Sequence, residues 1–72
     1  NSGVLFPNPF NIELNFSDKT IRSVKIIDAL GKIVFSANTN QKINTLTWRK
    51  GFYFYELETS DRDFRRGKII KQ

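Results

Sequence analysis

The chain has 72 residues, and its twelve Lys and Arg against seven Asp and Glu give a net charge of +5, with no Cys, His or Met. A chain of this length forms one domain at most and buries only about 60–65% of its unfolded surface, which disfavours a deep catalytic cleft. Without Cys and His it lacks a disulfide, a thiol nucleophile, the usual near-neutral general base and the commonest metal ligand. We therefore predict a non-enzymatic module with no catalytic residue, no metal site and no cofactor. From the missing Met we expect a piece of a longer chain.

The positive charge is concentrated at one end of the chain. Residues 1–61 hold seven Lys and Arg against six Asp and Glu, a net +1, whereas residues 62–72 hold five against one, a net +4. A basic end is typical of a segment that contacts nucleic acid or an acidic surface. A solvated edge strand, whose Lys and Arg discourage edge-to-edge pairing, explains the same pattern, and the charge alone favours this second interpretation.

The first predicted elements are a linker and two extended segments. Residues 1–3 are expected to be the end of a linker from a preceding segment, and the folded domain is expected over residues 4–72. Pro7 and Pro9 remove two backbone donors, which predicts an extended, poorly hydrogen-bonded segment at a sheet edge. Apolar and polar residues then alternate over residues 10–16, the pattern of a strand with one wet face.

A hairpin is predicted in the middle of the chain. Alternation around Val24 and Ile26 predicts a strand, and Asp28 and Gly31 stand at the first and fourth positions of a type I turn. Residues 31–37 then return as the next strand. The apolar residues of this region also fit a helical spacing, but their β-branched side chains and the glycine within the pattern favour the hairpin.

The second half of the chain completes a set of short strands. Residues 42–46 form a short one, residues 52–59 form the strongest one with Tyr53, Tyr55 and Leu57 on one face, and the basic end forms the last. Short strands with turns every 8–12 residues or so predict an all-β fold, a small immunoglobulin-like β-sandwich of about seven antiparallel strands. No stretch reaches the ~20 apolar residues of a transmembrane segment, and no signal peptide opens the chain.

Several local motifs suggest other functions. Residues 50–57 partly match the aromatic RNA-binding strand of the RRM domain, but Tyr53 stands where that pattern needs a small residue, and the RRM fold needs two helices. Trp48 lies in a predicted loop, where an exposed indole suits sugar binding and a buried one plugs the end of a core. Asp61 and Asp63 lack the ordered spacing of a calcium loop. An adhesive or carbohydrate-binding sandwich and a basic RNA-binding module therefore stay open as alternatives.

Four motifs in order resemble those of one known family. They are Phe-Pro-Asn-Pro at residues 6–9, a hairpin with an Asp-x-x-Gly turn at residues 24–34, Gly-Phe-Tyr at 51–53 and Lys-Ile-Ile-Lys at 68–71. The chain thereby resembles, over residues 5–72, the C-terminal sorting domain of type IX secretion cargo, the Por secretion system type A domain. The residues that match the family's motifs are Pro7, Asn8, Pro9, Phe10, Asp28, Gly31, Gly51, Tyr53, Gly67, Lys68, Ile69, Ile70 and Lys71.

The resemblance implies a removable address label on a larger exported protein. Its partners would be the outer-membrane secretion machinery, a sortase-like cysteine protease that cuts near or before residues 1–3, and an upstream cargo domain in the same precursor, with no nucleic acid. The protein would pass through the periplasm and reach the cell surface or the medium. The sequence departs from the family pattern at Phe6, usually a Tyr, at Trp48, usually a Leu, and at Thr45, where an apolar residue is common.

The matching residues are expected to differ in role. Gly31 and Gly51 should allow backbone geometry that other residues resist, and Asp28 should cap its own turn. Tyr53 should be a core residue with a hydrogen-bonding tip. The terminal strand, residues 67–71, is a candidate for docking because an edge strand offers unpaired backbone groups to a partner strand. That it simply completes the fold is an equally good interpretation, and both are compatible.

Overall fold

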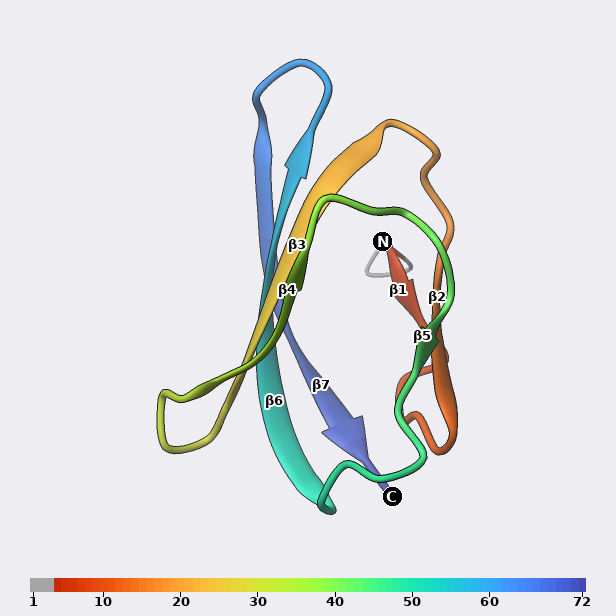
Figure 1. The fold of residues 1–72 in the computed structure, drawn as a ribbon, viewed down its shortest axis with the longest axis vertical. Helices are drawn as coiled ribbons and strands as arrows, with labels where there is room; N and C mark the ends of the chain where they lie inside the picture. The colour runs from red at the N-terminus through yellow and green to blue at the C-terminus, as the bar shows by residue number, and fades with distance from the viewer. Residues whose placement is uncertain (1–3) are drawn as a thin grey trace.

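The computed structural model describes residues 4–72, which form seven β-strands and contain no helix. Two antiparallel sheets result, one of three strands in the order β1-β2-β5 and one of four in the order β4-β3-β6-β7 (Figure 1). The strands are β1 (Leu5–Phe6), β2 (Glu13–Phe16), β3 (Ile21–Asp28), β4 (Ile33–Ala37), β5 (Ile43–Asn44), β6 (Gly51–Thr59) and β7 (Phe64–Lys71). The predicted all-β sandwich of about seven antiparallel strands is confirmed.

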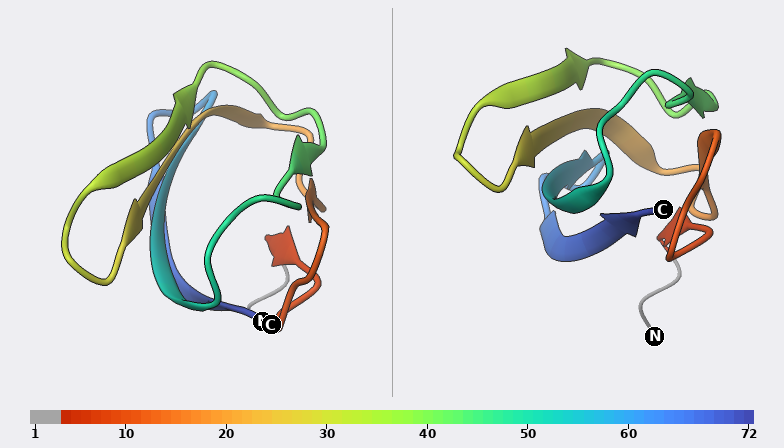
Figure 2. Two further views of the ribbon diagram at one scale, coloured as in Figure 1. Left: turned by 60° about the horizontal axis from the view of Figure 1, so that its bottom comes forward. Right: turned by 90° about the horizontal axis from the view of Figure 1, so that it is seen from below.

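The two sheets face each other and enclose one apolar core (Figure 2). Every second residue of a strand points to the same face, so alternation along β3 and β6 supplies the inner side of the larger sheet. The buried apolar side chains are Leu5, Phe10, Leu14, Ile21, Val24, Ile26, Ile43, Tyr53, Tyr55, Leu57 and Ile69. The predicted inner face of β6, with Tyr53, Tyr55 and Leu57, is confirmed.

The turn between β3 and β4 is built by Asp28. One Asp28 carboxylate oxygen accepts hydrogen bonds from the backbone N–H groups of Leu30 and Lys32, each at 2.9 Å, and the Asp28 carbonyl accepts one from Gly31 at 3.0 Å. Gly31 has φ +87°, a left-handed conformation that costs residues with a Cβ about 1 kcal/mol. The predicted hairpin, the capping role of Asp28 and the backbone role of Gly31 are confirmed, and the helical alternative is excluded.

Three predicted strands are shorter than their patterns suggest. The strand expected over residues 10–16 begins only at Glu13, and Ile12 is 54% exposed. The reason is that Phe10 pairs with β7 of the opposite sheet, so the chain crosses between the sheets before β2 starts. The strand expected over residues 42–46 covers only Ile43–Asn44, because the Asn44 side chain accepts the N–H of Leu46 and turns the chain. The strand expected from residue 31 begins at Ile33.

Gly67 permits a close approach between β7 and the ring of Tyr55. The two residues face each other across the β6–β7 ladder, and the phenol ring covers the glycine. A Cβ at residue 67 would lie 2.6 Å from Cζ and 2.8 Å from Cε2 of Tyr55, closer than real Cβ contacts come. Because Tyr55 is only 8% exposed, its ring has little room to move aside.

We predict that Gly67→Ala lowers the free energy of unfolding by about 1–3 kcal/mol, the usual cost of forcing a methyl group into a packed site. Urea unfolding followed by far-UV circular dichroism measures the loss. In a Tyr55→Leu background the same substitution should cost less, because the ring that the methyl group meets is gone. An equal cost in both backgrounds would contradict this account of Gly67.

Candidate functional site

The first and last motifs of the chain meet in one place, which we call the terminal clasp, residues 8–11 and 68–72. The Phe10 N–H donates to the Ile70 carbonyl at 2.8 Å, and the Gln72 N–H donates to the Phe10 carbonyl at 2.9 Å. These bonds form a short parallel bridge at the outer edge of β7. The opening segment therefore lies against the end of the chain, as the view from below shows (Figure 2).

The Asn8 side chain extends this pairing where the backbone cannot. Pro7 and Pro9 on either side of it have no N–H, so a continuous backbone ladder is impossible here. The Asn8 amide nitrogen donates to the Lys68 carbonyl at 3.2 Å, and its oxygen accepts the Ile70 N–H at 3.1 Å. The side chain thus takes the place of one residue of a paired strand. The backbone of this segment is poorly hydrogen-bonded, as expected, and the Asn8 side chain supplies the contacts that the sequence did not predict.

Lys71 closes the clasp from inside. Although it belongs to the basic end of the chain, only 6% of its surface is exposed, and its ammonium group donates a hydrogen bond to the Asn11 carbonyl. The Thr45 hydroxyl donates to the same carbonyl at 3.2 Å, and Thr45 is fully buried. A buried polar group needs such a partner, which explains how Thr45 fits where the family often has an apolar residue. The expectation of a solvated basic strand is wrong for Lys71.

An aromatic cluster seats the clasp on the core. The ring centre of Phe10 lies 5.9 Å from that of Trp48, edge to face, and 6.0 Å from that of Tyr53. Trp48 is half-buried and also packs 5.2 Å from Tyr53, so the predicted core plug is confirmed. Because the indole packs against this cluster, nothing in the structure favours a sugar-binding role for Trp48.

Tyr53 combines an apolar body with a polar tip, as predicted. Its hydroxyl donates to the Arg49 carbonyl at 2.6 Å, and the side chain is only 5% exposed. Burial raises the pKa of the Tyr53 phenol above its ordinary value, and the negative charge of Asp28 raises it further. The hydroxyl therefore remains a neutral donor at neutral pH.

The structure brings most of the family-motif residues together. Gly51, at φ +137°, faces Lys71 across the β6–β7 ladder, and Tyr53 faces Ile69. Together with Pro7, Asn8, Pro9, Phe10, Lys68 and Ile70, they lie in or beside the clasp. Asp28 and Gly31 lie apart from it, at the β3–β4 turn (Figure 1). Sequence reasoning missed the carbonyl of Asn11, since no sequence pattern marks a backbone acceptor.

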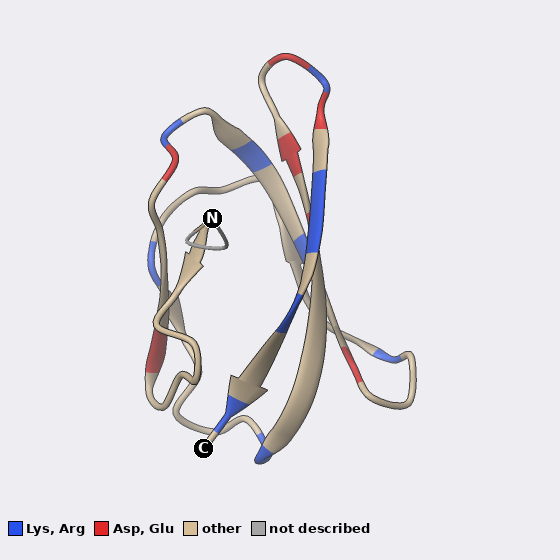
Figure 3. Ribbon diagram, turned by 180° about the vertical axis from the view of Figure 1, so that it is seen from behind, with Lys and Arg blue, Asp and Glu red and all other residues tan. Residues whose placement is uncertain are grey.

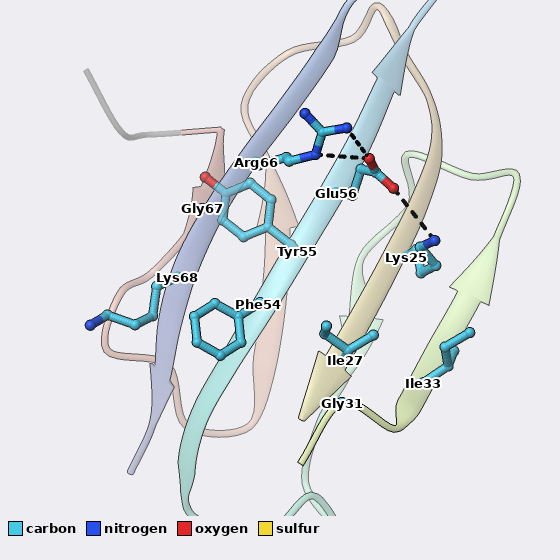
Figure 4. A pocket seen from close by; sticks show the side chains of 10 residues that line it. All are labelled: Lys25, Ile27, Gly31, Ile33, Phe54, Tyr55, Glu56, Arg66, Gly67 and Lys68. Carbon is cyan, nitrogen blue, oxygen red and sulfur yellow. Dashed lines mark hydrogen bonds and ion pairs between the residues drawn. The ribbon is translucent and has the colours of Figure 1, made fainter. Parts of the chain in front are cut away.

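A row of charges crosses the outer face of the four-stranded sheet. Glu56 of β6 accepts two bonds from Arg66 of β7, at 2.9 Å from Nε and 2.6 Å from an outer guanidinium nitrogen, and lies 3.5 Å from the Lys25 ammonium of β3. The cations spread along β7 are visible in Figure 3, and the row itself is drawn in Figure 4. The hydrogen bond from Arg66 is the main cause that lowers the pKa of Glu56 below its ordinary value, against a smaller opposing effect of desolvation.

Breaking the Asn8 contacts should loosen the clasp. Asn8→Ala removes two hydrogen bonds that are exposed to solvent, so we expect a loss of about 1–2 kcal/mol in the free energy of unfolding and faster amide exchange at Ile70. Hydrogen exchange followed by NMR measures both. Asn8→Asp keeps the acceptor and should keep more of the Ile70 protection than Asn8→Ala. Unchanged exchange at Ile70 in Asn8→Ala would contradict the assigned role.

The charge row predicts a specific pH dependence. Because the folded-state pKa of Glu56 is lowered, its ionised form stabilises the fold above the ordinary value of 4.5, and this contribution is lost as the pH falls through the lowered pKa. Glu56→Gln should therefore lose less stability than the wild type between about pH 7 and about pH 3, as measured by urea unfolding. Arg66→Gln should show a smaller reduction, because Lys25 still lowers the pKa of Glu56, and high salt should weaken the difference. Identical pH dependence in wild type and Glu56→Gln would contradict the prediction.

The described residues offer few other sites. Across residues 4–72 we find no group of three or more His, Cys, Asp or Glu side chains that are placed to hold a metal ion. Within the same residues, no helix is long and apolar enough to cross a membrane.

These features define a small β-sandwich domain that is closed by its own two terminal motifs. The chain belongs to the family of secretion system C-terminal sorting domains, whose pattern matches residues 4–72. Among solved structures, it is similar to the crystal structure of CopC from Methylosinus trichosporium OB3b, with 18% sequence identity, a TM-score of 0.48, and coverage of 93% of this chain and 88% of that one. A comparison with curated proteins found no match.

Family membership establishes the main function. The chain is a C-terminal sorting signal for type IX secretion, as the sequence motifs predicted. Domains of this family are sorting signals rather than catalysts, and they direct export toward the cell surface or the medium. Nothing in the fold or the comparisons favours the RNA-binding or the carbohydrate-binding alternative.

Proposed function

We propose that the terminal clasp is the feature of this sorting signal that the outer-membrane secretion machinery recognises after transit through the periplasm. A single observation carries the proposal: the opening and closing motifs, about sixty residues apart, form one hydrogen-bonded unit. Within it, Asn8, Pro9, Lys68 and Ile70 are exposed, and so is the adjoining Pro7. A partner that binds this surface distinguishes the folded domain from an unfolded one, because only folding brings the two ends together.

The clasp limits where a partner strand can pair with β7, whose terminal part, residues 67–71, is the docking candidate from the sequence. Along an edge strand, alternate residues point their backbone groups outward, and in β7 these include Lys68 and Ile70. Asn8 and Phe10 already occupy the Lys68 carbonyl and both backbone groups of Ile70. By the same alternation, Phe64 and Arg66 also face outward, and they lie beyond the reach of the clasp. A partner strand therefore has the first half of β7 available and not the terminal motif.

We further propose that a sortase-like cysteine protease separates the domain from an upstream cargo, near or before residues 1–3. The Ser17 N–H donates to the Val4 carbonyl at 3.0 Å, which ties residue 4 to the end of β2. A protease needs an extended segment that is free of such pairing, so cleavage has to fall before residue 4. This supports a domain boundary between residues 3 and 4, with the preceding residues as a linker.

A reporter fusion tests the proposal. Residues 1–72 are fused behind a periplasmic reporter in a host that has a type IX system, and the reporter is measured in the medium and at the cell surface. We expect export of the wild-type fusion and a severalfold reduction for Asn8→Ala and Pro9→Ala. Both substitutions alter the exposed side of the clasp and leave the core residues in place.

Two measurements separate recognition from folding. Far-UV circular dichroism of the purified variants shows whether they are folded at the growth temperature. Asn38→Ala, on the exposed connection after β4, serves as the control, and its export should be normal. Folded Asn8→Ala and Pro9→Ala domains that are exported at the wild-type level would refute recognition through the clasp. A wild-type fusion that stays in the periplasm would refute the sorting function itself.

A further inference from the structure

The outer face of the four-stranded sheet carries a groove that the clasp does not use. Six of the residues that line it determine whether it is apolar or charged: Lys25, Ile27, Ile33, Phe54, Arg66 and Lys68. We call it the outer groove. The register places Ile33 opposite Ile27, Ile27 opposite Phe54, and Phe54 opposite Lys68, so these side chains form a line across all four strands (Figure 4).

The floor of the outer groove is apolar and open to solvent. Ile33 is 54% exposed and Phe54 is 42% exposed, and the next row adds Phe52 and Ile70 at 49% and 36%. Single exposed apolar residues are ordinary on a protein surface, but a contiguous row of them is typical of a binding site. A solvated sheet face usually carries polar residues. Folding alone therefore does not explain this exposed apolar row.

The border of the outer groove is basic. On one side runs the charge row of Lys25, Glu56 and Arg66, in which two cations share one carboxylate and leave a net +1. At the β7 end, the Lys68 ammonium lies 4.9 Å from the ring centre of Phe52 and forms no ion pair within residues 4–72. An occupant with apolar side chains and carboxylates complements both the floor and the border.

The dimensions of the outer groove suit an extended peptide. Four strands span three interstrand distances, or about 14 Å, which corresponds to about four residues of extended chain. A lipid surface offers no match for the carboxylate of Glu56, which stands in the charge row beside the apolar floor. A second copy of the domain is disfavoured, because each copy carries a net charge of +5 and would bring the same cations face to face.

The domain's own cargo is not placed to fill the outer groove. The chain enters the fold at β1, which belongs to the three-stranded sheet and faces the inner side of the four-stranded sheet (Figure 1). The residues that line the outer groove lie on the other face of the four-stranded sheet. A polypeptide attached before residue 4 therefore begins on the opposite side of the sandwich.

We propose that the outer groove is a second docking site, which binds an extended segment of a secretion-machinery protein with apolar residues flanked by carboxylates. This inference rests on the proposed sorting function but uses a surface distinct from the clasp. Phe54 contributes the central apolar contact, and Lys68 with the charge row receives the carboxylates of the segment. The site gives the machinery a contact on the flat face of β6 and β7, while the clasp is recognised at their end.

Titration of the full 72-residue chain with a defined probe tests the site. The probe is a peptide of about seven residues with alternating Asp and Leu, long enough to cross the groove. We expect saturable NMR shifts at Ile27, Ile33, Phe54 and Lys68. Phe54→Ser should weaken binding by about tenfold, because it removes the central aromatic contact. The matched control is Phe64→Ser, which removes an exposed Phe of the same face that does not line the groove. Its ring meets the border only at the Arg66 guanidinium, 5.6 Å from the ring centre, and Arg66 keeps its bonds to Glu56, so the variant should bind nearly normally.

Each other outcome overturns the assignment. If a peptide of alternating Lys and Leu caused equal shifts, the basic border would not select carboxylates. Equal losses in Phe54→Ser and Phe64→Ser would show non-specific adsorption to the sheet. Shifts at the groove with vesicles of anionic phosphatidylglycerol, but none with the peptide, would assign the face to a membrane instead.

The reporter fusion separates this inference from the proposed function. If the site acts in secretion, Phe54→Ser and Ile33→Ser should reduce export, while Phe64→Ser should not. Normal export of both groove variants, with export of the wild type intact, would refute the outer groove and leave the sorting function standing. Failure of the wild-type fusion would instead refute the sorting function.

Discussion

The pairing of Phe10 with the end of β7 is the contact on which the rest of the structure depends. Its two backbone hydrogen bonds, to Ile70 and from Gln72, hold the opening segment in the larger sheet although β1 and β2 belong to the smaller one. The Phe10 ring is thereby inserted between the sheets, where it meets Trp48 and Tyr53. A chain of this size has few core residues, so the loss of one fully buried Phe would leave the sandwich open at this end.

β7 combines three roles because each of its sides faces a different environment. Its inner side contributes Ile69 and Lys71 to the core and the clasp. Its edge is paired with the opening segment over the terminal motif and is open earlier, around Arg66. Its outer side lines the groove. The positive charges concentrated at this end of the chain therefore lie in different environments. Only some of them are available to a partner.

Local patterns predicted the strands and turns that are determined by neighbouring residues. Alternation identified the inner face of β6, and the Asp-x-x-Gly spacing identified the β3–β4 turn, since one carboxylate and one left-handed glycine build it. Ile12 and Lys71 could not be placed in this way. Ile12 is exposed because the chain changes sheets beside it, and Lys71 is buried because a carbonyl sixty residues away accepts its hydrogen bond. Such contacts between distant residues leave no periodicity in the sequence.

The clasp forms only in a chain that contains both residues 8–11 and residues 68–72. A polypeptide that ends before Lys68 has no partner for Asn8, no backbone for Phe10 to pair with, and no ammonium group for the Asn11 carbonyl. Residues 8–11 are made first during synthesis, but they stay unpaired until residues 68–72 have been added. A precursor truncated before Lys68 therefore carries every upstream motif and still lacks the assembled surface, so a receptor for the clasp would accept only chains that include residues 68–72.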